Sequence, residues 1–165
     1  MLPLLTRIDH VGIACRDLDK TIELYQATFG LEVASLEVHE DQGVREAMLR
    51  VGGGSDPAAG TRAAGALGAG ALGAAAVLPG YVQLLEPLAP DTPVGKFLGR
   101  RGQGLHHIGY GVSDVRKALA AVGGTGIRLI DERPRHGSMG ASIAFLHPAD
   151  LGGVLTELVQ AADPA

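Results

Sequence analysis

A stretch of the chain near its N-terminus recurs in the second half of the sequence. Residues 9–20 align with residues 106–117, where a His, a Gly, an Asp and a Lys coincide, so that His107 lies 97 positions after His10. Each copy begins with a short apolar run interrupted by small residues, which is typical of a buried strand, and continues into a pattern of helical periodicity. A repeat of this kind predicts two similar modules within one fold.

Each copy predicts the same order of secondary structure. In the first helix the apolar residues recur at helical spacing, at Leu18, Ile22, Tyr25 and Phe29. An aspartate precedes each helix as an N-cap would, and a glycine follows each helix where helices commonly end. Three strand-like stretches follow each helix, at 32–38, 44–51 and 80–85 in the first copy and at 127–130, 141–146 and 153–159 in the second. We therefore expect the order β-α-β-β-β twice.

The two copies differ in length because of one segment rich in Gly and Ala. The last predicted strands correspond at Gln83 and Glu157, an offset of only 74, so the first copy holds 23 extra residues. The segment 52–78 accounts for them, and its composition predicts a flexible insertion. We predict a single domain of residues 1–165, with modules at 5–88 and 104–160 and a linker helix at 92–101.

Charge and cysteine content exclude several classes of function. The 165 residues carry a formal net charge of -4, and their Lys and Arg are scattered, so nucleic acid is not expected as the main partner. The single cysteine, Cys15, excludes an intramolecular disulfide and fits a cytoplasmic location. The N-terminus lacks the basic region of a signal peptide, so we read the mature protein as beginning at Met1. Residues 63–78 are interrupted by Gly and too short to span a membrane, so no membrane partner is expected.

Four polar residues occupy equivalent positions in the two copies. His10 and His107 lie in the first strands, and Gln83 and Glu157 lie in the last strands. Equivalent positions of two modules related by a pseudo-twofold axis converge on that axis. Two imidazoles, an amide oxygen and a carboxylate suit a borderline or hard divalent cation. We predict that these four residues bind one divalent metal ion.

Glycines follow both histidines at the spacing of one strand face. Gly12 shares a face with His10, and Gly109 shares a face with His107. Because glycine weakens a strand interior unless another group must approach it, we expect open volume beside the two histidines. Either histidine alone would more often be a hydrogen-bonded core residue. Polar groups repeated at equivalent positions favour a functional site instead.

The other histidines do not share this pairing. His106 is expected on the strand face opposite to that of His107, because side chains alternate along a strand. His39 and His136 lie in polar surroundings, and His147 precedes a proline at a turn. We interpret these four as structural or surface residues.

Six motifs, in this order and at this spacing, carry a resemblance to a known family. They are the segments 8–11 (IDHV), 41–46 (DQGVRE), 82–88 (VQLLEPL), 104–108 (GLHHI), 145–148 (FLHP) and 153–158 (GVLTEL). With them the chain resembles the vicinal-oxygen-chelate superfamily and, within it, the methylmalonyl-CoA epimerase family, over nearly all residues except 52–78. The resemblance implies an α+β fold in which two tandem βαβββ modules form a cupped, barrel-like mixed sheet around a metal site.

The resemblance also implies an activity and a set of site residues. The activity is the epimerisation of (2R)- and (2S)-methylmalonyl-CoA by removal of the C2 proton through a metal-chelated enolate. The metal ligands of the family fall on His10, Gln83, His107 and Glu157, and its catalytic carboxylate falls on Glu46. Glu157 is the implied second acid or base, unless a metal-ordered water takes that part. Co²⁺ is the favoured ion, with Ni²⁺, Mn²⁺ or Zn²⁺ as alternatives, and a homodimer with an acyl-CoA substrate is implied.

The phosphates of a coenzyme A arm would need positively charged or N–H hydrogen-bond donors on the protein. The candidates are Lys96, Arg100, Arg101, Arg133 and Arg135, together with backbone N–H groups of the segment 135–140.

Two other functions are compatible with the sequence. A glyoxalase-type isomerase of the same superfamily uses a similar four-ligand site. A metal-free small-molecule binding protein shares the architecture but does not need the ligand set. An extradiol dioxygenase is disfavoured, because Gln83 as a fourth protein ligand would occupy a position that oxygen and substrate need.

Overall fold

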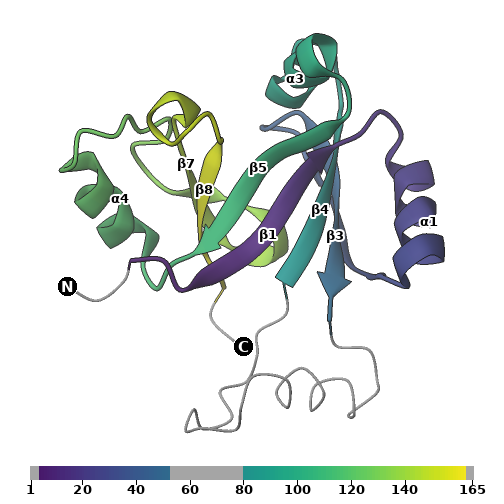
Figure 1. Ribbon diagram of the computed structural model, residues 1–165, viewed down its shortest axis with the longest axis horizontal. Coiled ribbons are helices and arrows are strands. Elements are labelled where there is room, and N and C mark those ends of the chain that lie inside the picture. The colour runs from purple at the N-terminus through teal and green to yellow at the C-terminus, as the bar shows by residue number, and fades with distance from the viewer. Residues whose placement is uncertain (1–3, 53–79, 163–165) are drawn as a thin grey trace, which may run out of the picture.

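One curled, mixed sheet contains the strands of the described residues, which are 4–52 and 80–162 of this computed structural model (Figure 1). Its order is β2-β3-β4-β1-β5-β8-β7-β6. The strands are β1 (Arg7–Ala14), β2 (Glu32–His39), β3 (Val44–Val51), β4 (Gly80–Pro87), β5 (Gly104–Gly111), β6 (Arg135–His136), β7 (Ser142–Leu146) and β8 (Thr156–Gln160). The helices are α1 (Leu18–Phe29), α3 (Pro93–Arg101) and α4 (Val115–Gly123), with 3-10 turns η1 (Ser138–Gly140) and η2 (Pro148–Asp150).

The two halves of the sheet are built alike and meet at its centre. Strand β1 pairs in parallel with β4, and β5 pairs in parallel with β8. Strands β1 and β5 pair with each other in antiparallel orientation and cross the middle of the molecule (Figure 1). This arrangement confirms the predicted α+β fold class. The module bounds 5–88 and 104–160 stay predictions, and the predicted insertion lies outside the described residues from position 53 on.

Helices α1 and α4 begin at the residues that the sequence suggests, and α1 also ends where expected. The side chain of Asp17 accepts a hydrogen bond from the backbone N–H of Lys20 at the start of α1, and Asp114 accepts one from Lys117 at the start of α4, both at 3.0 Å. Helix α1 ends at Gly30, whose φ of 67° places it in the left-handed region that glycine adopts readily.

Two of the buried apolar clusters lie where helices cover the outer face of the curled sheet, one in each half. Leu18 of α1 packs with Leu49 and Leu84 of the first half. In the second half, Leu119 of α4 packs with Leu158 of β8. Because side chains alternate along a strand, covering the outer face with these helices leaves the neighbouring positions of β3, β4 and β8 to face the inside of the curl. Those positions carry the polar residues of the site.

The strands of the second half differ from the sequence expectation. No strand forms at 127–130, where Leu129 makes only an isolated bridge to Leu146; a short β6 forms later, at Arg135–His136. Strand β8 begins at Thr156 instead of at 153, because Gly152 and Gly153 both have positive φ and form a turn. The sequence pattern marks apolar stretches, whereas strand bounds depend on which neighbours offer hydrogen bonds.

The opposite edges of the curled sheet are linked across its opening. The side chain of Gln42, next to β2, donates to the backbone oxygen of His136 in β6 at 3.0 Å. The backbone N–H of Met139 donates to the Glu37 side chain of β2 at 2.9 Å. These contacts hold the turn η1 of the second half against the first half. None of the helices in the two described ranges has the length and hydropathy needed to cross a membrane.

Candidate active site

Three of the four residues predicted to bind metal bring their side-chain atoms together inside the curl. The Nε2 atoms of His10 and His107 are 2.9 Å apart. The Oε2 atom of Glu157 lies 2.8 Å from the first of these and 3.3 Å from the second. All three residues are buried, each with less than a twentieth of its surface exposed. Residues almost 100 and 150 positions apart in the chain thus meet at one point.

The glycines identified in the sequence make room for the opposite histidine. In the antiparallel pairing of β1 and β5, His10 faces Gly109 and Gly12 faces His107. A β-carbon on Gly12 would overlap the ring of His107, and one on Gly109 would overlap the ring of His10. The expectation of open volume beside the histidines was therefore wrong. Each ring fills the space that the partner strand's glycine leaves.

The residue before each histidine supports its ring. Asp9 Oδ1 lies 3.2 Å from His10 Nδ1, and His106 Nδ1 lies 2.9 Å from His107 Nδ1. Neighbours in a regular strand point to opposite faces, but the pairing of β1 with β5 shifts register at two places. Asp9 and His106 are the extra residues at these bulges, so each lies beside its neighbour. The prediction that His106 faces away from His107 was therefore wrong.

The local charges of the site attract a cation. Burial lowers the pKa of His10, but hydrogen bonds to Asp9 and Glu157 outweigh this effect and raise it to about 9. Burial raises the pKa of Glu157, but hydrogen bonds with both histidines outweigh it and lower that pKa to about 2. Burial lowers the pKa of His106 to about 4, which keeps this ring neutral. An anionic carboxylate held between two imidazoles is a favourable place for positive charge.

The donor set fits a divalent metal ion. Ligands bonded at about 2.1 Å and at right angles around one ion are about 3 Å apart, which is close to the separations of the two Nε2 atoms and Glu157 Oε2. The raised pKa of His10 means that its ring carries an extra proton in the metal-free protein. A metal ion that displaced the Nε2 proton would leave Nδ1 donating to Asp9 and the Nε2 lone pair free to bind it. Gln83 Oε1 is buried and has no hydrogen-bond partner among the described residues, as a fourth ligand atom without its ion would be.

Glu46 lies next to these candidate ligands, on the other side of Gln83. The amide of Gln83 donates to Glu46 Oε2 at 2.8 Å, which leaves the amide oxygen unpartnered. Glu46 is 4% exposed, and burial raises the pKa of its carboxyl, although its hydrogen bonds with Ser138 and His39 offset part of the effect. A buried carboxylate with a raised pKa is suited to taking and returning protons.

Two residues of this part of the site were not identified from the sequence. Ser138 Oγ donates to Glu46 Oε1 and accepts from the amide of Gln83 at 3.0 Å. His39 Nε2 lies 3.1 Å from Glu46 Oε1. The sequence drew attention to the segment 135–140 for its backbone N–H groups, whereas it contributes the hydroxyl of Ser138. The only sequence signal for His39 is its place at the end of the strand that pairs with the strand of Glu46.

Comparison with known proteins assigns the chain to a family. Residues 7–158 match the model of the glyoxalase/bleomycin resistance protein/dioxygenase superfamily. The chain belongs to this superfamily. A further relative is the ethylmalonyl-CoA/methylmalonyl-CoA epimerase of Cereibacter sphaeroides, which is 30% identical over 157 residues, 93% of this chain and 97% of that protein.

Solved structures of this superfamily are similar to the chain over nearly its whole length. One is a methylmalonyl-CoA epimerase in complex with methylmalonyl-CoA and NH4+, at 48% identity and a TM-score of 0.80, covering 96% of both chains. Another is a variant of the Streptomyces coelicolor methylmalonyl-CoA epimerase in complex with 2-nitronate-propionyl-CoA, at 47% identity and a TM-score of 0.80, covering 96% of this chain and 99% of that one. The predicted resemblance to the methylmalonyl-CoA epimerases within the superfamily is confirmed.

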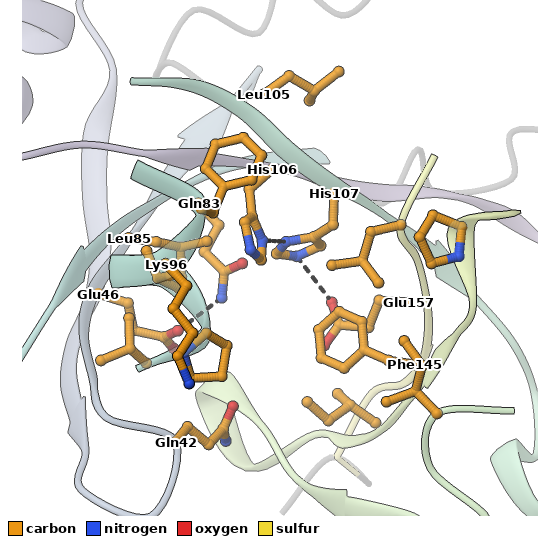
Figure 2. A pocket seen from close by; sticks show the side chains of 18 of the residues that line it. Gln42, Glu46, Gln83, Leu85, Lys96, Leu105, His106, His107, Phe145 and Glu157 are labelled. Atoms are coloured by element: carbon orange, nitrogen blue, oxygen red, sulfur yellow. Dashed lines mark hydrogen bonds and ion pairs between the residues drawn. The ribbon is translucent and has the colours of Figure 1, made fainter. Parts of the chain in front are cut away.

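A cavity of about 720 Å³ opens beside the site, with its polar residues on two sides. Glu46 and Gln83 lie on one side of it, and His107 and Glu157 lie on the other (Figure 2). Phe97 of α3 and Phe145 of β7 add apolar surface to the lining.

Most of the predicted phosphate donors lie on the lining of this cavity. They are Lys96, Arg100 and Arg101, all on α3, and Arg135 on β6. Arg133 lines a separate, smaller pocket beside α4 and does not join them. Within the superfamily this chain therefore combines a metal-type donor set, a buried carboxylate and a cavity rimmed by cations.

Proposed function

We propose that this protein is a metal-dependent methylmalonyl-CoA epimerase that interconverts the 2R and 2S forms of its substrate. The observation that carries the proposal is the position of Glu46, a buried carboxylate that lines the cavity and is bonded to Gln83 beside the histidine and carboxylate cluster. The similarity to epimerases solved with methylmalonyl-CoA and with 2-nitronate-propionyl-CoA supports the choice of substrate.

We assign to Glu46 the removal of the proton from C2. The C–H bond at C2 is a weak acid, and a carboxylate with an ordinary pKa is a poor base for it. Burial raises the pKa of Glu46 and so strengthens it as a base. Ser138 and Gln83 donate to its two oxygens and fix its direction. Displacing a base by about 1 Å costs orders of magnitude in rate, so these donors matter for turnover.

His10, Gln83, His107 and Glu157 would hold the divalent ion. When bound, this ion would supply positive charge against the negative charge that develops on the substrate oxygens as the C2 proton leaves. The family resemblance favours Co²⁺ over Ni²⁺, Mn²⁺ or Zn²⁺. The lowered pKa of Glu157, about 2, favours the role of a ligand over its predicted second role as an acid or base.

The cations of α3 would receive the coenzyme A arm. Lys96, Arg100 and Arg101 lie along one helix at the rim of the cavity, and phosphates bind to such groups through charge-assisted hydrogen bonds. A homodimer and a cytoplasmic location stay predictions. The first comes from the family resemblance, and the second from a single cysteine, Cys15, which is a buried free thiol.

Hydrogen exchange at C2 tests the proposal directly. In deuterated water the Co²⁺-loaded protein is expected to exchange the C2 hydrogen of methylmalonyl-CoA, measured by mass spectrometry. Glu46→Gln should lower this rate about 100-fold or more while elemental analysis finds the same metal content. Glu32→Gln, at an exposed position of β2, serves as the control. A wild-type protein that exchanges nothing but converts a hemithioacetal would contradict the proposal and indicate a glyoxalase-type isomerase.

A further inference from the structure

Three titratable side chains, those of Glu46, His39 and Glu37, are in contact one after the other on the side of Glu46 away from the proposed metal ligands. His39 Nε2 lies 3.1 Å from Glu46 Oε1 and 3.4 Å from Glu37 Oε2. Exposure rises along the chain, with 5% of the Glu46 side chain, 10% of the His39 side chain and 29% of the Glu37 side chain accessible to solvent. These three side chains therefore connect the buried carboxylate of Glu46 to the surface.

This route does not pass through the cavity. Glu46 is among the described residues that line the cavity, whereas neither His39 nor Glu37 is. A substrate that fills the cavity separates Glu46 from the water there, but it leaves the two residues behind Glu46 untouched. The strand pairing explains the arrangement, since Glu37 of β2 faces Glu46 of β3 and His39 lies two residues further along the same face of β2.

Glu37 is held in place by contacts from both halves of the molecule. Ser35 Oγ donates to Glu37 Oε1 at 2.7 Å, and the backbone N–H of Met139 donates to the same oxygen at 2.9 Å. Its other oxygen, Oε2, is the one that faces His39. An exposed glutamate would ordinarily sample many rotamers. Here one oxygen is anchored, and the second stays directed at the imidazole.

An epimerase has a particular need for such a route. If Glu46 removes the C2 proton, it ends the step as a carboxylic acid, and a proton that enters the other face of C2 comes from elsewhere. Glu46 must then lose its proton to water before it can act again on the same epimer. With 4% of the residue exposed, Glu46 has little direct contact with solvent.

We propose that His39 passes the proton of Glu46 to Glu37 and so to water. The inference rests on the proposed function. The protonated Glu46 gives its proton to the lone pair of neutral His39 at Nε2, which leaves Glu46 ionised and His39 as an imidazolium. The N–H bond at the same Nε2 then breaks, and the proton passes to ionised Glu37 Oε2. Glu37 releases it to water, so His39 and Glu37 return to the states in which the relay began, and Glu46 is left ionised and ready to remove another proton.

The label in recovered substrate tests this route separately from catalysis. We choose the Co²⁺-loaded full chain in deuterated water, with one epimer as substrate, a quench at low conversion and deuterium measured in both epimers. Product gains deuterium in every active protein, because its new hydrogen comes from solvent. Recovered substrate gains deuterium only if Glu46 exchanges its proton before returning it. The ratio of label in recovered substrate to label in product therefore reports the exchange at Glu46.

His39→Gln keeps a polar side chain at this position but cannot relay a proton. We expect it to lower the ratio at least fivefold, and Glu37→Gln to lower it in the same direction. Glu32→Gln, at an exposed position of β2, should leave the ratio at its wild-type value. A substitution that only disturbed the position of Glu46 would slow both labelling reactions together and leave the ratio unchanged.

The outcomes distinguish the two proposals. Wild-type protein that labels neither epimer would overturn the proposed function. Wild-type protein that labels product but not recovered substrate would overturn the relay, since Glu46 would then return its proton to C2 before His39 could remove it. An unchanged ratio in His39→Gln, with wild-type labelling intact, would also overturn it and leave His39 as a structural partner of Glu46.

Discussion

The ring of His107 occupies the space above Gly12 that a β-carbon at that position would need. The relation is reciprocal, because the ring of His10 occupies the corresponding space at Gly109. Two strands that cross the centre of the sheet therefore each supply one histidine and one gap. The close approach of the two Nε2 atoms depends on both gaps, so the glycines belong to the site although they have no side chains.

Adding a methyl group at Gly12 is expected to disrupt metal binding. The methyl group of Gly12→Ala would overlap His107 and push its ring away from His10, so the affinity for Co²⁺ should fall about tenfold or more, by analogy with the loss of groups that orient metal ligands. Isothermal titration of metal-free protein measures this change. Gly99→Ala in α3 is the matched control, because no described atom lies within 4 Å of its new carbon. A Gly12→Ala protein that binds Co²⁺ as the wild type does would contradict this account of the glycine.

Removing the charge of Asp9 should weaken metal binding at the same site through its contact with His10. Asp9 is buried and bonded to His10 Nδ1, so it fixes the tautomer that leaves Nε2 free for the metal. Asp9→Asn keeps the size of the side chain but removes its charge, and we expect Co²⁺ affinity to fall about tenfold. Asp91→Asn, at an exposed position before α3, should not change it. Equal affinities in the two variants would show that the carboxylate of Asp9 has no such function.

Loss of the Ser138 hydroxyl should affect turnover more than metal binding. Ser138 donates to Glu46 and also accepts from Gln83. In Ser138→Ala the buried carboxylate loses a donor, and we expect kcat to fall about tenfold while the Co²⁺ stoichiometry stays the same. Ser113→Ala, an exposed serine before α4, is the control. A Ser138→Ala protein with normal kcat but reduced metal content would instead assign Ser138 to the support of Gln83.

Acid stability should depend on an ion pair outside the lining of the cavity. Two side-chain nitrogens of Arg128 bond to the carboxylate of Asp150 at 2.8 Å, and the backbone N–H of Arg128 adds a third bond. These bonds from Arg128 lower the pKa of Asp150 well below its ordinary value of about 4. A lowered pKa means that the pair stabilises the fold above about pH 4 and that this contribution is lost as the pH falls further.

Asp150→Asn has no carboxylate to protonate at this position. Its Tm at pH 7 should lie below that of the wild type, and the difference should shrink between about pH 4 and pH 2. Thermal unfolding followed by circular dichroism across this range measures the effect. Glu132→Gln, at an exposed position, should track the wild type throughout. A difference between wild type and Asp150→Asn that stays constant down to pH 2 would contradict the assignment.

The internal repeat predicted much of the fold and the meeting of three site residues from the sequence alone. Equivalent positions in two modules converge by symmetry, and His10, His107 and Glu157 do meet, whereas metal binding by these residues and Gln83 stays a prediction. The capping aspartates located the helices because the cap is a local interaction, made within three residues. Glu46 was identified only by resemblance to a family, since one glutamate in a strand has no local signal of its burial.

The tertiary structure decided what local patterns cannot specify. Asp9 and His106 support the histidines because two bulges place them beside their neighbours, and a bulge depends on how two strands pair. Ser138 reaches Glu46 across 92 positions of the chain because the edges of the curled sheet are linked there. His39 gained its place from the pairing of β2 with β3. Residue periodicity predicts strand faces, but the register between strands determines which side chains come into contact.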